Sequence, residues 1–125
     1  AVQAVLANQA DALRLYPDPD ATALKQAIAN QQKVELDQVF VGNGSDEVLA
    51  HIFKAFFIQN EPVLYPDITY SFYPVYSQFF AIQTKQIPLN ENFEIDVSDY
   101  QQENGGIIIT NPNAPTSIAF GLDQI

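Results

Sequence analysis

Apolar side chains recur at spacings of three and four in several parts of the chain, which is typical of amphipathic helices. The clearest pattern follows Ser45, where apolar residues occupy positions 48, 49, 52, 53, 56 and 57. Ser45 is the expected N-cap of this helix, because its hydroxyl can accept a hydrogen bond from a free backbone N–H. The aromatic segment 69–80 is also predicted to be a helix, with Pro74 in its first turn or at a kink.

Two weaker helical patterns precede these segments. Residues 1–14 are predicted to form a helical arm, since their valines and leucines recur at helical spacing. A second helix is expected from a cap at Asp20 to about Lys33. The segment 16–20 between them contains two prolines and two aspartates, which favours a turn.

Short runs rich in β-branched and aromatic residues predict strands. These runs are 39–41, 62–66, 81–89 and 107–110. A brief alternation over 93–97 precedes Ser98, the expected cap of a short helix that ends at Glu103. Because strands alternate with helices, we expect an α/β fold with βαβ units and a mainly parallel sheet flanked by helices.

The charge balance argues against two classes of binding partner. The 125 residues suffice for one ordinary domain, and 15 acidic against 5 basic side chains give a formal net charge of −10. Nucleic acids and anionic membrane surfaces are not expected partners, because both are bound mainly through lysine and arginine. No apolar run reaches the roughly 18 residues of a membrane span, and the N-terminus lacks the basic region of a signal peptide. We therefore expect a cytoplasmic protein.

Composition also limits metal chemistry. The chain has no cysteine and a single histidine, His51, so neither a disulfide framework nor a thiolate or multi-histidine metal site is expected. His51 is expected to be a surface or half-buried helix residue rather than a catalytic one. The acidic residues are dispersed along the chain, and no metal ligand is predicted.

A candidate anion site lies at the junction of the predicted strand 39–41 and the helix after it. Gly42 and Gly44 allow the backbone to turn sharply and to approach a ligand closely. The N–H groups that open a helix have no acceptor inside it, and the helix dipole favours an anion there. One interpretation is a phosphate held by the N–H groups of residues 44–46, and the other is an ordinary strand-to-helix turn.

Two further segments follow predicted strands, where ligands bind in open α/β sheets. Tyr70 comes soon after the strand 62–66, and its ring could stack on a flat heterocycle. The other aromatic residues up to position 80 are expected in the core or an interface. The amide side chains of 111–116 follow the strand 107–110, and this segment is either a ligand contact or a proline-rich turn.

Four motifs together resemble those of one enzyme family. They are Tyr16-Pro17-Asp18-Pro19, Val41-Gly42-Asn43-Gly44-Ser45-Asp46-Glu47, Thr69-Tyr70-Ser71-Phe72-Tyr73 and Asn111-Pro112-Asn113-Ala114-Pro115-Thr116. Their order and spacing are similar to those of the histidinol-phosphate aminotransferases, which are class-II aminotransferases of the fold-type-I architecture. The resemblance implies a helical arm over 1–15. Over 16–125 it implies part of a three-layer α/β/α large domain that binds pyridoxal 5′-phosphate (PLP).

The resemblance also implies roles for the candidate residues. Backbone N–H groups at Gly44, Ser45 and Asp46 would hold the PLP phosphate, and Tyr70 would stack on the pyridine ring. Tyr16 would reach across a homodimer interface toward the phosphate of the neighbouring subunit.

One motif departs from the family pattern. Family members have an asparagine that hydrogen-bonds the phenolic oxygen of PLP, and the matching position here is Ala114, which cannot donate that bond. Asn113 is the expected substitute. Ser117 stands in the position of a family glycine, and Ile68 in that of a family proline.

Family enzymes are much longer than this chain. Their cofactor-binding lysine, the aspartate facing the pyridine nitrogen and the arginine that grips the substrate carboxylate would all follow residue 125. The resemblance therefore implies a segment that holds no catalytic residue and is inactive alone. Its strand at 39–41 would lack its family neighbours, so we expect the strands to pair again or a second copy to cover the open edges.

The complete enzyme would move an amino group between histidinol phosphate and 2-oxoglutarate. Two alternatives stay open at this point. One is another fold-type-I enzyme, such as a threonine-phosphate decarboxylase or an aromatic aminotransferase, and the other is a non-catalytic α/β interaction module.

Overall fold

The computed structural model describes residue 3 and residues 14–124. The chain divides into two compact units, residues 1–42 and 43–125, and each is described by itself. The first unit contains α2 (Thr22–Gln32) and the 3-10 helix η2 (Leu36–Gln38). Nearly all of the arm expected over 1–15 lies outside the described residues.

The start of α2 differs from the prediction. Its N-cap residue is Ala21, in the left-handed conformation with φ of 49°, and not Asp20. The carboxylate of Asp18 instead accepts hydrogen bonds from the N–H groups of Thr22, at 2.7 Å, and Asp20, at 3.0 Å. These bonds stabilise the charged carboxylate and lower the pKa of Asp18. The aspartate two residues earlier therefore closes the turn before the helix.

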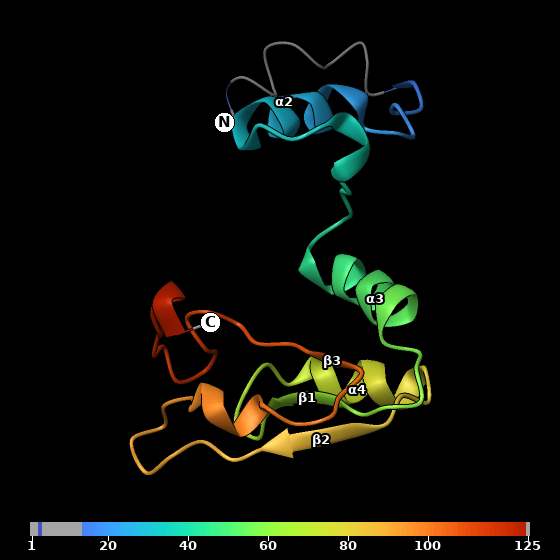
Figure 1. Ribbon diagram of the computed structural model, residues 1–125. Helices are drawn as coiled ribbons and strands as arrows, with labels where there is room; N and C mark the ends of the chain where they lie inside the picture. Colours follow the sequence, from blue (N-terminus) through green and yellow to red (C-terminus); the bar gives the residue numbers. More distant parts are fainter. Residues whose placement is uncertain (1–2, 4–13, 125) are drawn as a thin grey trace. The chain divides into compact units, whose positions relative to one another are not determined.

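The second unit is built around a small parallel sheet (Figure 1). Its elements are α3 (Ser45–Phe56), β1 (Val63–Pro66), α4 (Phe72–Phe79), β2 (Thr84–Ile87), η3 (Val97–Tyr100), β3 (Gly106–Ile107) and η4 (Leu122–Gln124). The strand order is β2-β1-β3, and β1 pairs in parallel with both neighbours. The expected α/β fold, a parallel sheet flanked by helices, is therefore confirmed.

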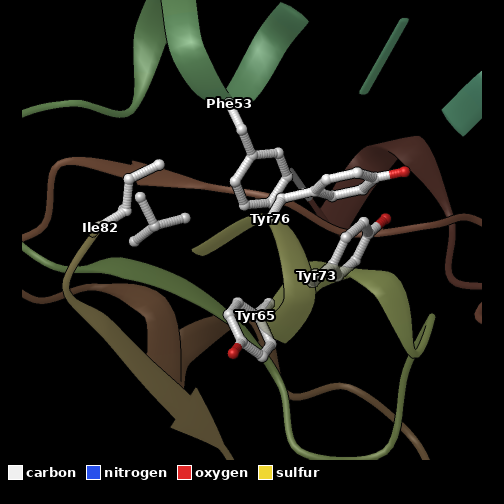
Figure 2. Close-up of a cluster of buried hydrophobic side chains, with 6 residues drawn as sticks. Phe53, Tyr65, Tyr73, Tyr76 and Ile82 are labelled. Atoms are coloured by element: carbon white, nitrogen blue, oxygen red, sulfur yellow. The ribbon is translucent and has the colours of Figure 1, made fainter. Parts of the chain in front are cut away.

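The main core lies between one face of the sheet and the two longest helices of this unit. Figure 2 shows its labelled aromatic and aliphatic side chains packed together. The buried members are Phe53, Val63, Tyr65, Tyr73, Tyr76 and Ile82. On the opposite face, Leu64 of β1 packs with Ile87 and Tyr100. Successive residues of β1 thus point to opposite faces, and both faces are covered.

Helix boundaries in this unit follow from local chemistry. α3 begins at Ser45, and its N-cap is Gly44 rather than the expected Ser45. Gly44 has a φ of 87°, a conformation that glycine adopts without the strain that other residues pay. Pro74 lies in the first turn of α4, as predicted, where a missing N–H breaks no helical hydrogen bond.

Three strand predictions are corrected. Residues 39–41 are not a strand in the described structure; Val39 is extended, but no neighbouring strand pairs with it. The strand expected over 107–110 is β3, which is only Gly106–Ile107, followed by one further bond from Ile108 N–H to the Leu64 carbonyl at 3.0 Å. The strand expected over 81–89 is limited to β2. Each run therefore forms a strand only where a partner backbone lies beside it.

The region after β2 is also simpler than expected. Residues 93–97 form no strand, and the helix expected to run from Ser98 to Glu103 is the 3-10 helix η3 alone. Its cap is Asp96, whose carboxylate accepts a bond from the Ser98 N–H at 2.9 Å. Among the residues that the structure describes, no helix has the length and apolar character needed to cross a membrane.

Candidate functional site

The turn that opens α3 presents backbone N–H groups to solvent. A Cβ built on Gly44 would meet no atom within 4 Å, so the space beside this turn is open. The first N–H groups of a helix have no acceptor within the helix, and the helix dipole adds positive potential. The N–H of Asn43 donates to the carboxylate of Glu47. An anion at this turn would therefore use the N–H groups of residues 44–46.

Tyr70 lies beside this turn. Its hydroxyl donates a hydrogen bond to the Asp46 carboxylate in the first turn of α3. The carboxylate and its negative charge favour the neutral phenol, which raises the pKa of Tyr70 to about 12. Two predicted site segments, 24 residues apart in the chain, are therefore brought together by a direct contact.

The neighbouring aromatic residues hold Tyr70 in place. Its ring stacks on Phe72 with centroids 5.8 Å apart and meets Tyr73 edge to face at 5.7 Å. The hydroxyl of Tyr76 donates to the backbone carbonyl of Asp46 at 3.1 Å. Figure 2 shows the hydroxyls of Tyr73 and Tyr76 on the same side of the cluster, away from Ile82. The expected aromatic core is confirmed for Tyr73 and Tyr76, and Tyr70 is a half-buried residue packed against it. Phe72 and Phe79, which were also expected in the core or an interface, are exposed.

Asn113 is 2% exposed, and its side chain is fully hydrogen-bonded. Its Oδ1 accepts bonds from the hydroxyls of Thr69, at 2.9 Å, and Thr110, at 3.2 Å. Its Nδ2 donates to the carbonyl of Ile68, at 2.9 Å, and to the hydroxyl of Thr116, at 3.3 Å. An amide side chain has two donors and two acceptor lone pairs, so this set uses all of them. In this arrangement Asn113 has no donor left for the phenolic oxygen of a cofactor.

Ala114 and Ser117 lie in the same loop as Asn113. The exposed Ala114 donates its N–H to the Thr110 hydroxyl at 3.2 Å. Ser117 has a φ of 62°, in the left-handed region that favours glycine. The structure thus gives a physical reason for the glycine that the resemblance places there.

The threonines around Asn113 were not singled out from the sequence. Thr69 lies 44 residues before Asn113, and no local pattern links the two positions. The sequence shows only that a threonine hydroxyl follows one predicted strand and an asparagine amide follows another. Their contact can be predicted only when these two strands are known to be neighbours in the sheet.

The remaining predicted residues are described within their own units. Tyr16 is in the first unit and is fully exposed, so its role in a dimer stays a prediction. His51 is an exposed residue of α3. Across residues 14–124, no three His, Asp or Glu side chains are grouped closely enough to hold a metal ion.

The chain is similar to known proteins over its whole length. The family model of aminotransferase class I and II matches residues 1–125. Proteins named histidinol-phosphate aminotransferase are 82% identical in Acinetobacter baumannii (strain SDF) and 78% in Acinetobacter baylyi, over all 125 residues. One named histidinol-phosphate aminotransferase 1 from Pseudomonas fluorescens is 54% identical. The chain spans about 35% of the length of these curated relatives.

A solved structure shares the fold. It is a crystal structure from Erwinia carotovora atroseptica SCRI1043, provisionally named as a histidinol-phosphate aminotransferase. The TM-score is 0.83 at 19% identity, over 98% of this chain and 37% of the other. The match of the family model to every residue and the shared fold lead to one conclusion: the chain belongs to the aminotransferase class I and II family.

Proposed function

We propose that this chain forms the phosphate-binding part of a PLP-dependent histidinol-phosphate aminotransferase. The observation that carries the proposal is the 78–82% identity to proteins of that name across all 125 residues. The geometry supports it independently, because an open helix N-terminus and an aromatic ring are joined by the contact between Tyr70 and Asp46.

The residues at the start of α3 fit a phosphorylated aromatic cofactor. N–H groups of Gly44, Ser45 and Asp46 would bind the phosphate, since the space beside Gly44 is open. Tyr70 would bind one face of the cofactor ring, while Phe72 packs against the tyrosine. When bound, PLP supplies an electron sink for chemistry at the substrate amino group. Gly44, Ser45, Asp46 and Tyr70 would bind and orient the cofactor.

The two lysines of the second unit, Lys54 and Lys85, are held at other places on their own elements. Lys54 is in the last turn of α3, and nine residues of helix at 1.5 Å each place it about 13 Å along the axis from Ser45. The ammonium of Lys85 contacts the side-chain oxygen of Gln102. The resemblance places the cofactor-binding lysine of the family after residue 125, and not at Lys25 or Lys33. We therefore propose that the chain binds and orients the cofactor phosphate but does not transfer amino groups by itself.

We further propose the substrates and the oligomeric state of the whole protein. Its substrates would be histidinol phosphate and 2-oxoglutarate, and it would act in histidine biosynthesis in the cytoplasm. It would work as a homodimer in which the exposed Tyr16 contacts the partner subunit. The exposed position of Tyr16 is compatible with such a contact.

A chimera tests this function. The matching 125 residues of the Acinetobacter baumannii (strain SDF) relative are replaced by this chain, and amino transfer from histidinol phosphate to 2-oxoglutarate is measured. We expect transfer comparable to that of the relative, and none by the 125-residue chain alone. Activity of the chimera only on aromatic amino acids, or only decarboxylation of threonine phosphate, would contradict the substrate assignment.

A further inference from the structure

The loops that follow β1 and β3 are joined at the carboxyl edge of the sheet. β1 ends at Pro66 and is followed by the turn that carries Tyr70, while β3 ends at Ile107 and leads to Asn113. The two strands are parallel neighbours, so these loops leave the sheet side by side. Beyond the ends of the strands, the ladder no longer joins the two loops, so other contacts must join them.

Asn113 supplies the contacts between these loops. Its amide donates to the Ile68 carbonyl at 2.9 Å, and it accepts the Thr69 hydroxyl at 2.9 Å. Both partners immediately precede Tyr70 in the chain. The side chain is buried, so breaking either bond would leave an unpaired polar group away from water.

The remaining bonds of Asn113 fix its own loop. The backbone N–H of Asn113 donates to the Ile118 carbonyl at 2.9 Å, and its carbonyl accepts from the Ser117 N–H at 2.7 Å. Its Nδ2 also donates to the Thr116 hydroxyl within this loop. These bonds fix Asn113 within the loop after β3. Its side chain then makes two hydrogen bonds to residues 68 and 69 in the loop after β1.

We propose that Asn113 is a positioning residue that holds the turn before Tyr70, and so directs the Tyr70 ring toward the first turn of α3. It acts through the carbonyl of Ile68 and the hydroxyl of Thr69 and does not contact the ligand itself. An effect of Asn113 on cofactor binding rests on the proposed function. Its effect on the position of Tyr70 is independent of that function.

The test uses the full 125-residue chain without cofactor. Tyrosine is labelled with 13C at Cζ, the Tyr70 signal is assigned with Tyr70→Phe, and ring contacts to Phe72 are measured by NMR. Thr69→Val removes one of the two bonds between the loops with little change in volume. Thr116→Val is the matched control, because it removes a bond from the same Asn113 within one loop.

We expect Thr69→Val to shift the Tyr70 signal and to weaken its contact with Phe72, and Thr116→Val to leave both unchanged. The Tyr65 and Tyr73 signals report the core in each variant and should not move. Asn113→Leu should have a larger effect on Tyr70 than Thr69→Val; if that variant does not fold, the threonine pair decides.

An unchanged Tyr70 in Thr69→Val, or equal changes in both threonine variants, would overturn the positioning role. Failure of the chain to bind a phosphorylated pyridine would overturn the proposed function but would leave this result intact, because no cofactor is present in the NMR experiment.

Discussion

The hydroxyl of Tyr70 donates a hydrogen bond to the carboxylate of Asp46, across 24 residues of sequence. This contact joins the turn after β1 to the first turn of α3. Within that turn, the Asp46 carboxylate accepts from the Tyr70 hydroxyl and the Glu47 carboxylate accepts from the Asn43 N–H. The Tyr70 ring and the backbone at the start of α3 are thereby held next to each other.

This contact predicts a pH dependence. The Asp46 carboxylate raises the pKa of Tyr70 to about 12, whereas an unfolded tyrosine titrates near 10. A group whose folded pKa is raised stabilises the fold fully below its unfolded pKa, and that contribution is lost as the pH rises through the folded value. The stabilisation that the contact contributes should therefore be complete up to about pH 10 and decline between about pH 10 and 12. The contact itself should persist until the 13C signal of Tyr70 titrates near pH 12.

Asp46→Asn provides the control for that titration. It removes the negative charge, so the pKa of Tyr70 should fall toward its usual value. Burial raises the pKa of Tyr100 to about 12, and Tyr100 packs on the other face of the sheet. Its titration should not change in Asp46→Asn. An unchanged Tyr70 titration in this variant would contradict the assigned hydrogen bond.

Phe53 should be among the most sensitive positions of the second unit. Its fully buried ring lies within 6 Å, centroid to centroid, of Phe57, Tyr73 and Tyr76. Phe53→Ala should lower the free energy of unfolding by about 3–5 kcal/mol, as is usual for a large core aromatic. Urea unfolding followed by circular dichroism measures this.

Phe56→Ala is the matched control in the same helix. Phe56 is 64% exposed, so its truncation should change the free energy of unfolding by no more than about 0.5 kcal/mol. Equal losses from the two substitutions would mean that the helix does not pack through the face that Phe53 occupies.

Gly106, the first residue of β3, has no room for a side chain. Its φ is 151°, and a Cβ there would lie 2.6 Å from Cε1 of Phe57. Gly106→Ala should therefore cost about 1–3 kcal/mol of unfolding free energy, as overpacking does. Adding Phe57→Ala should recover part of that loss in a double-mutant cycle. Strictly additive losses would show that the two residues do not collide.

Local pattern was sufficient to predict the central elements of this fold. The apolar spacing after Ser45 and the run at 62–66 predict α3 and β1; β1 is buried throughout, and α3 packs on the core through Phe53. The run 39–41 is also rich in β-branched and aromatic residues but forms no strand, because strand formation depends on a partner and not on propensity alone.

The candidate site was predictable in part. The glycines and helix start at 42–46 indicate an anion site from local chemistry, and the structure leaves that turn open. The burial and hydrogen bonds of Asn113 could not be predicted from the sequence. Its bonds to Ile68 and Thr69 form because β1 and β3 are neighbours in the sheet. Its sequence position suggested a ligand contact, whereas its burial makes it part of the framework.

The central claim is that the start of α3 binds the phosphate of a pyridine cofactor beside Tyr70. Pyridoxine 5′-phosphate and pyridoxine differ only in the phosphate, and neither carries the aldehyde that would react with surface lysines. The most direct measurement is therefore an amide NMR titration of the 15N-labelled chain with each compound. We predict that the phosphorylated compound shifts the amide signals of Ser45 and Asp46, and that pyridoxine does not. Equal shifts with both compounds, or shifts confined to other residues, would contradict the account.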